Sequence, residues 1–396
     1  MKRFFSLSLI GWLATTCFAD AADLFLKVDL PLKTPRKKES VLGSPVDKVL
    51  FGCWIPEGVK IVRGAIVNPF AKQEVPGKHW QEAARLWDFA VVSAEFDAVK
   101  SDEYPLLLTA LKEFAKKSGH PEIEHVPLCF IGMSRGGGMS ARMAALWPAR
   151  TIAAAPVCLE VGPQDDATRR IPFMTIFGQK DGKQMALLAE RLPVQRKQGA
   201  LWASVVQWGR GHEFALANNI AIPFFAAAIA RRVPPDQDAR HGPVTLRERA
   251  EADGYLGDRA AWGKTVATVA RFQSYTHDKV QACWLPDARV AAVWQAFVSP
   301  SKEVVIQTPP GLGDKQPFVL HSANTPVKAV VQVGGALKIE SVALYDADVA
   351  LAELRQPPFK FDIKLGPGIH SLIARVTTAD KQMLLSRPHT IVVSRK

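Results

Sequence analysis

Hydrophobic positions between residues 24 and 232 alternate between two spacings. Short apolar runs rich in Val, Ile and Phe, such as 126–131 and 173–177, are separated by longer segments in which apolar residues recur every three to four positions, such as 104–118. Runs of the first kind are typical of strands covered on both faces, and the second kind of amphipathic helices. The alternation predicts an α/β fold with a doubly wound, mostly parallel sheet.

The expected strands are 24–28, 48–55, 62–67, 89–94, 126–131, 152–157, 173–177 and 202–207. The expected helices are 80–87, 104–118, 139–147, 183–191 and 214–231. In a sheet of this kind, reacting groups gather beyond the carboxyl ends of the strands.

The pattern changes after residue 232. Residues 233–317 carry large aromatic side chains and include two expected helices, at 245–253 and 292–297, so we interpret them as a packed connector. After the turn residues 309–313, apolar and polar positions alternate with a period of two, which predicts a small all-β sandwich over 318–396. Its expected strands are 327–333, 339–345, 359–363, 368–376 and 389–393. The α/β domain therefore spans 22–232.

The first 21 residues have the features of a secretory signal peptide. Lys2 and Arg3 precede an apolar stretch, 4–13, and small residues follow up to Ala19 and Ala21. The stretch is too short to span a bilayer, and no later run is longer. We expect cleavage of residues 1–21, export to the periplasm or the medium, and no membrane span.

Composition narrows the range of partners. The chain has 396 residues, 48% of them hydrophobic, and a formal charge of +12. Its basic residues are spread along the sequence without a continuous stripe, which favours a solvated basic surface over a nucleic-acid partner. The chain contains neither C-x-x-C nor H-x-x-x-H, so we expect no metal and no cofactor. The pairing of Cys53, Cys129, Cys158 and Cys283 stays open, as does the oligomeric state.

Ser134 is the first candidate for chemistry. Residues 132–136 form a G-x-S-x-G motif directly between an expected strand and an expected helix. In that setting the chain reverses sharply and exposes the serine on a strained turn. The expected strand and helix on either side of the motif, rather than the G-x-S-x-G residues alone, indicate that Ser134 is a nucleophile.

A serine hydroxyl needs a base to take its proton and an acid to orient that base, and in this fold class the chain order is Ser, acid, His. His212 lies just past the expected strand 202–207, and Asp181 follows the expected strand 173–177. The alternative acids are on the preceding loop: Glu160, Asp165 and Asp166.

Taken together, Gly132-x-Ser134-x-Gly136, Gly178-x-x-Asp181 and the Gly-His212-Glu-Phe segment resemble the α/β-hydrolase superfamily. Within it, the chain is similar to the secreted dienelactone-hydrolase-like and polyhydroxyalkanoate-depolymerase or feruloyl-esterase-like group. The resemblance covers about residues 45–232. It implies acyl transfer, in which Ser134 attacks a carbonyl, His212 moves the proton, and Asp181 holds the imidazole.

One part departs from that group. Its members place a His-Gly pair after the third strand, where this chain has Asn68-Pro69-Phe70-Ala71. Pro69 has no N–H to donate. The oxyanion donors are therefore expected to be the backbone N–H of Arg135 and that of Phe70, or of Ala71 instead. For the Arg135 side chain we expect a structural bond near the turn, in preference to a contact with an acidic substrate.

The segment 318–396 resembles the bacterial immunoglobulin-like module found on secreted carbohydrate-active enzymes. The similarity rests on residues 341–346, 357–361 and 368–374, in that order. The resemblances together imply a secreted serine esterase that acts on small-molecule or polysaccharide esters. Two alternatives stay open: a serine peptidase of the same fold, and a non-catalytic binding protein, which the 68–71 segment favours.

Overall fold

The computed structural model describes residues 22–37, 40–159, 162–163, 165–300, 303–307, 317–320, 325–335 and 337–395. The expected signal peptide, 1–21, and the turn segment 309–313 lie outside the described residues.

The N-terminal half contains an eight-stranded sheet with the order β1-β2-β4-β3-β5-β6-β7-β8. From β4 to β8 all neighbours are parallel, whereas β2 runs antiparallel to both of its neighbours, β1 and β4. The mostly parallel sheet is thus confirmed. Its strands are β1 Leu24–Pro31, β2 Lys48–Ile55, β3 Gly64–Asn68, β4 Phe89–Ala94, β5 Leu128–Met133, β6 Thr151–Val157, β7 Phe173–Gly178 and β8 Trp202–Gln207.

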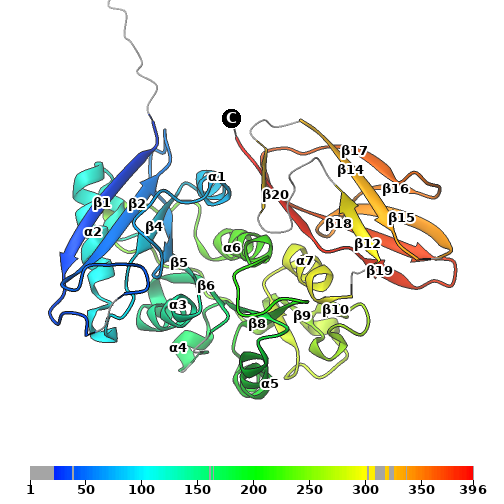
Figure 1. Cartoon of the computed structure of the whole chain (residues 1–396), viewed down its shortest axis with the longest axis horizontal. Helices are drawn as coiled ribbons and strands as arrows, with labels where there is room; N and C mark the ends of the chain where they lie inside the picture. Colours follow the sequence, from blue (N-terminus) through cyan, green and yellow to red (C-terminus); the bar gives the residue numbers. More distant parts are fainter. Residues whose placement is uncertain are drawn as a thin grey trace, which may run out of the picture.

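Helices cover both faces of this sheet (Figure 1). On one face lie α1 Lys78–Trp87, α6 Asn218–Arg232 and α7 Ala288–Val298, and on the other α3 Arg135–Leu146 and α5 Gly182–Lys197. The remaining helices are α2 Leu106–Ser118, which packs against β1, and the short α4 Asp166–Arg169. Among the described residues, none of the helices combines the length and the apolarity that crossing a membrane requires.

The helix expected at 245–253 is wrong. Only a short 3₁₀ helix, Glu251–Asp253, forms at its end. Val244 and Leu246 are both buried, a period of two that suits an extended segment, and the Arg247 N–H donates to the carbonyl of Arg232 at the end of α6. Docking of this backbone on α6 therefore outweighs the helical propensity of the charged residues.

The rest of the connector is packed, as its aromatic residues predict. A small antiparallel sheet with the order β10-β9-β11 forms there, which the sequence pattern did not predict. Its strands are β9 Tyr255–Gly257, β10 Val269–Arg271 and β11 Cys283–Leu285. Trp284 and Tyr275 share a buried cluster with Leu201, which precedes β8.

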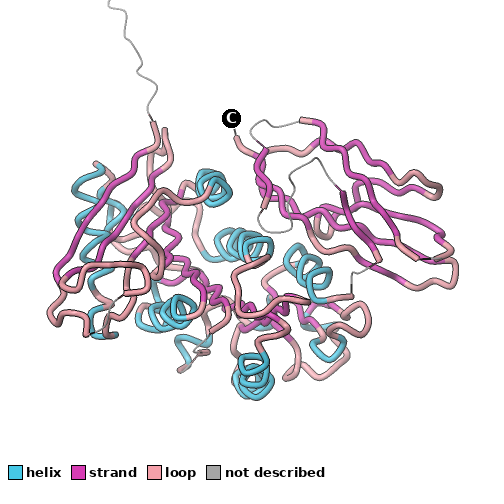
Figure 2. Tube along the Cα trace, viewed as in Figure 1, coloured by secondary structure: helices cyan, strands magenta, loops and turns pink. Residues whose placement is uncertain are grey.

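After α7 the described residues form only strands and loops (Figure 2). Two sheets, with the orders β12-β14-β17 and β13-β20-β18-β15-β16, share one apolar core, and β19 pairs with β18. Residues 304–307, which lie before position 318, belong to this β module because Val304 and Ile306 alternate into its core. The strands are β12 Val304–Gln307, β13 Phe318–Leu320, β14 Pro326–Val333, β15 Ile339–Asp346, β16 Val349–Leu354, β17 Lys360–Lys364, β18 Gly368–Thr378, β19 Met383–Leu385 and β20 His389–Val393.

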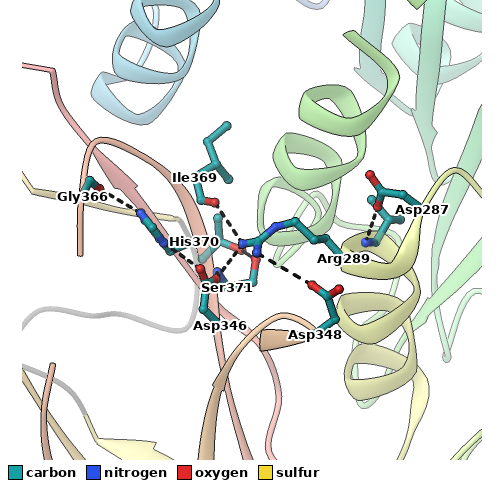
Figure 3. A network of polar contacts seen from close by, with 10 residues as sticks. Asp287, Arg289, Asp346, Asp348, Gly366, Ile369, His370 and Ser371 are labelled. Carbon is teal, nitrogen blue, oxygen red and sulfur yellow. Dashed lines mark hydrogen bonds and ion pairs between the residues drawn. The ribbon is translucent and has the colours of Figure 1, made fainter. Parts of the chain in front are cut away.

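The β module is docked on the helices of the α/β part. Ile373 and Leu385 of the module belong to the same buried core as α6 and α7. Figure 3 shows a polar contact between the two parts, in which Arg289 of α7 donates to the Asp346 carboxylate over 2.8 Å. Asp346 also accepts hydrogen bonds from His370 Nδ1 at 2.8 Å and from the Ser371 N–H at 2.9 Å.

Candidate active site

Ser134 occupies the turn between β5 and α3, as the motif predicts. Its backbone has φ 54° and ψ −120°, a conformation that a non-glycine residue rarely adopts. The strain is held by two backbone hydrogen bonds, from Ser134 N–H to the Val157 carbonyl at 2.8 Å and from Gly138 N–H to the Ser134 carbonyl at 3.1 Å. The side chain is half-buried at the carboxyl end of the sheet.

The glycines around Ser134 are required by close packing. A Cβ on Gly132 would lie 2.6 Å from the backbone of Gly136, and one on Gly136 would lie 2.6 Å from the Cβ of Phe70. A Cβ on Gly137 would lie 2.6 Å from the Leu159 carbonyl oxygen. The first turn of α3 can therefore lie close to β5 and β6 only because these side chains are missing.

His212 and Asp181 form a hydrogen-bonded pair. The His212 Nδ1 and the Asp181 Oδ2 are 2.7 Å apart, and they come from the loops after β8 and β7. Asp181 occupies the N-cap position of α5, but its carboxylate does not cap the helix and faces the imidazole instead. The Asp181 side chain is 13% exposed and that of His212 is 45% exposed, so the imidazole can be reached from solvent.

Cys158 is a third group at this place, and the sequence analysis missed it as part of the site. Its Sγ, a His212 ring nitrogen and an Asp181 carboxylate oxygen all lie within 4.8 Å of one another. Burial raises the pKa of the thiol to about 11, so the sulfur is protonated at neutral pH, and it donates to the Glu213 carbonyl at 3.4 Å. Only its position, directly after β6, signalled this placement.

Cys158 lies between Ser134 and the His212–Asp181 pair along a chain of contacts. The Ser134 N–H bonds Val157, the residue before Cys158, and the thiol of Cys158 lies beside His212. Ser134, Asp181 and His212 therefore follow β5, β7 and β8 at one edge of one sheet. Within the described part of the chain, no hydrogen bond joins the Ser134 hydroxyl to His212, so the catalytic roles of the three residues stay a prediction.

The alternative acids have other partners where they are described. The Asp165 carboxylate caps α4 by accepting from the Thr168 N–H at 2.8 Å, and Asp166 pairs with Arg169 at 2.8 Å. Glu160 lies outside the described residues.

The expected oxyanion donors differ in their availability. The Phe70 N–H donates to the Oδ1 of Asn68 at 3.1 Å, and the Ala71 N–H donates to the Ala94 carbonyl at 3.2 Å. Arg135 is the first residue of α3, where backbone N–H groups have no partner inside the helix. The assignment of Arg135 and Phe70 as donors stays a prediction, and Asn68 competes for the second of them.

The Arg135 side chain makes the structural bond that we expected. Its Nη1 lies 2.8 Å from Oδ1 of Asp97, which is fully buried after β4, while 59% of the Arg135 side chain is exposed. Burial acts to raise the pKa of Asp97. Hydrogen bonds from Ser40, Val41 and Arg135 outweigh burial and hold that pKa below its ordinary value.

A cleft with a volume of about 1010 Å³ lies against α3. Arg135, the residue after Ser134, lines it, whereas Ser134, Asp181 and His212 are not among the described residues of its wall. Arg135, Gly138 and Met139, all in the first turns of α3, form one wall. Residues of the segments 34–37 and 98–104 and of α5 form the others. Through Arg135, the cleft comes to within one residue of Ser134 along the chain.

No family model matches this sequence, and no curated protein matches it. Among solved structures, the chain is similar to the fluorophosphonate-binding serine hydrolase F of Staphylococcus aureus, with 10% identity and a TM-score of 0.38, over 52% of this chain and 99% of that one. It is also similar to a feruloyl esterase module from Clostridium thermocellum, with 12% identity and a TM-score of 0.33, over 48% and 82% of the two chains. A third match, to fibronectin(III)-like modules of Clostridium thermocellum CbhA, has 14% identity and a TM-score of 0.20, over 23% and 96%.

Proposed function

We propose that this chain is a serine hydrolase of the α/β-hydrolase type that cleaves carboxylic esters. The observation that carries the proposal is the 2.7 Å pair of His212 and Asp181 at the same edge of the sheet as the strained Ser134 turn. A serine on a strand–turn–helix corner and an acid-oriented imidazole are the two parts that acyl transfer needs.

The roles follow from the chemistry of each group. The Ser134 hydroxyl attacks the ester carbonyl, and His212 takes its proton and passes it to the leaving alcohol. Asp181 fixes the imidazole by accepting from Nδ1, which leaves Nε2 to face the serine. The backbone N–H of Arg135, at the N-terminus of α3, would donate to the developing oxyanion, and water would then hydrolyse the acyl-enzyme.

The finer parts of the proposal concern substrate and location. An exported enzyme with a β module of the immunoglobulin-like kind would act on esters carried by polysaccharides, and residues 1–21 would direct it to the periplasm or the medium. A peptidase of the same fold would differ from an esterase in its substrate, because it cleaves amide bonds rather than ester bonds. Matched ester and amide derivatives of one acyl group decide between the two.

One observation favours a second candidate, a non-catalytic protein on the same scaffold. The Phe70 N–H is engaged by Asn68, so an incoming oxyanion would find one donor fewer. A lost donor of this type typically costs about a hundred- to a thousand-fold in rate.

Labelling with a fluorophosphonate probe, followed by intact mass, tests the proposal. We expect a single adduct on the wild type, none on Ser134→Ala, and labelling slowed at least about a hundredfold in His212→Ala. Ser140→Ala is the matched control, because Ser140 lies in the same helix and its buried hydroxyl has no hydrogen-bond partner among the described residues. A folded wild type that takes up no probe would contradict the esterase and support the binding protein.

A further inference from the structure

The cleft that lies against α3 is cationic. Five basic residues line it: Lys37, Lys100, Arg135, Arg142 and Arg191. Among the described residues that line this cleft there is no carboxylate. The spread of basic residues along the sequence did not reveal this gathering, because it brings together segments that are far apart in the chain.

The five cations come from four separate parts of the fold. Arg135 and Arg142 lie on α3, Arg191 on α5, Lys100 on the segment after β4, and Lys37 on the loop after β1. Arg142 is seven residues beyond Arg135, which is about 10 Å along a helix. The positive charge therefore begins next to Ser134 and continues away from it along the wall of the cleft.

Part of this charge is not balanced by the protein. Arg135 is paired with Asp97, but no carboxylate of the described residues pairs with Lys100 or Arg142. The Arg142 side chain instead hydrogen-bonds the hydroxyl of Tyr104, which also lines the cleft. Like charges held around one hollow repel each other, and a bound anion removes that cost.

We infer that this cleft binds an acidic oligosaccharide, so that the ester cleaved at Ser134 is carried by a polyanionic glycan. The inference rests on the proposed function for its catalytic part. Apolar side chains such as Met139, Leu159 and Leu187 line the cleft between the cations, as the faces of sugar rings require. The extent of the positive charge fits several repeating anionic groups rather than a single one.

Binding of unesterified oligogalacturonate to the full chain, by titration calorimetry, tests the inference. We expect a Kd that rises about tenfold or more between 50 and 200 mM salt, and at least about a further tenfold in Lys100→Gln/Arg142→Gln. The matched control is Lys328→Gln/Lys360→Gln, which removes two exposed lysines from the β module and should leave the Kd within about twofold. Thermal unfolding establishes that both double variants are folded.

Comparison of oligogalacturonate with other ligands identifies the type of anionic group that the cleft binds. A sulfated oligosaccharide that binds more tightly than oligogalacturonate would assign the cleft to sulfate rather than carboxylate and still support an acidic glycan. Equal binding of a neutral xylo-oligosaccharide, or tighter binding of single-stranded DNA, would overturn the inference. So would equal losses of affinity in the two double variants.

Fluorophosphonate labelling separates this inference from the proposed function. Saturating oligogalacturonate should slow labelling of the wild type at Ser134, and a neutral oligosaccharide should not. A labelled protein that binds no oligogalacturonate overturns the acidic-glycan cleft and leaves the hydrolase intact. A protein that binds it but takes up no probe overturns the hydrolase and retains the cleft as a glycan-binding site.

Discussion

At the scale of single residues, the chemistry of this site depends on which polar groups are already engaged. Asp181 is free to orient His212 because it does not cap α5. Asn68, in contrast, accepts the Phe70 N–H that an oxyanion would use. In the proposed reaction, the side chain of Asn68 would therefore compete with the oxyanion for the Phe70 N–H.

Replacing Asn68 tests this competition. We expect Asn68→Ala to raise kcat for ester hydrolysis about tenfold or more, because the Phe70 N–H loses its intramolecular acceptor. Steady-state kinetics on an aryl acetate measure the effect. Asn68→Asp keeps an acceptor oxygen and adds a negative charge, so its kcat should stay at or below that of the wild type. A lower kcat in Asn68→Ala would mean that the Asn68 bond positions the turn.

At the scale of elements, the conformation of the Ser134 turn depends on how closely α3 approaches β6. A Cβ on Gly137 would lie 2.6 Å from the carbonyl oxygen of Leu159 and 2.7 Å from that of Val157, the last residue of β6. Backbone oxygens cannot move away as easily as the end of a flexible side chain can. The glycine after the motif therefore supports the same turn as the motif itself.

Gly137→Ala should destabilise the protein by about 1–3 kcal/mol, since its methyl group would overlap backbone oxygens. It should also slow fluorophosphonate labelling, because a shift of α3 away from β6 would displace Ser134, the N-cap residue of α3. Urea denaturation measures the first effect. Gly182→Ala at the start of α5 is the control, since its Cβ would meet no atom within 4 Å. Equal stability of the two variants would contradict this account of the turn.

At the scale of the whole molecule, the β module is held by both apolar and polar contacts. Its Ile373 and Leu385 complete the core that α6 and α7 begin. Asp346 stands between Arg289 of α7 and His370 of the module, as Figure 3 shows. Burial acts to raise the pKa of Asp346, but these hydrogen bonds and charges outweigh it and lower that pKa.

Asp346→Asn should lower the free energy of unfolding at pH 7 by about 2 kcal/mol. A carboxylate with a lowered folded pKa stabilises the fold above its unfolded pKa, near 3.8, and loses that effect as the pH falls through the folded value. The difference between wild type and variant should therefore stay constant from pH 7 to pH 5 and shrink below about pH 4. Urea denaturation at these pH values measures it.

The control for this prediction is Asp348→Asn. Asp348 lies 3.8 Å from Arg289 and its side chain is 37% exposed, so its loss should change stability by less than about 0.5 kcal/mol. If the two variants were equally stable, the polar contact at Asp346 would not hold the module to α7.

Most of the elements and the order of the candidate site residues could be predicted from the amino-acid sequence. Strands 48–55, 89–94 and 202–207 have the predicted bounds, and Ser134, Asp181 and His212 follow strands of one sheet as their spacing predicts. These features are local, because the period of hydrophobic positions (two in strands, 3.6 in helices) and a glycine-flanked turn are determined by residues close together in the sequence. The helix predicted at 245–253 from the same local pattern was wrong, because contacts of this segment with α6 determine its conformation.

The surroundings of those residues could not be predicted from the sequence, because they depend on how the chain folds in three dimensions. Asn68 engages the Phe70 N–H, Cys158 lies beside His212, and Arg289 meets Asp346. The cationic cleft likewise gathers Lys37, Arg142 and Arg191 from distant segments. Such contacts depend on which loops the sheet order brings together, and neither the periodicity nor the composition of the sequence contains that order.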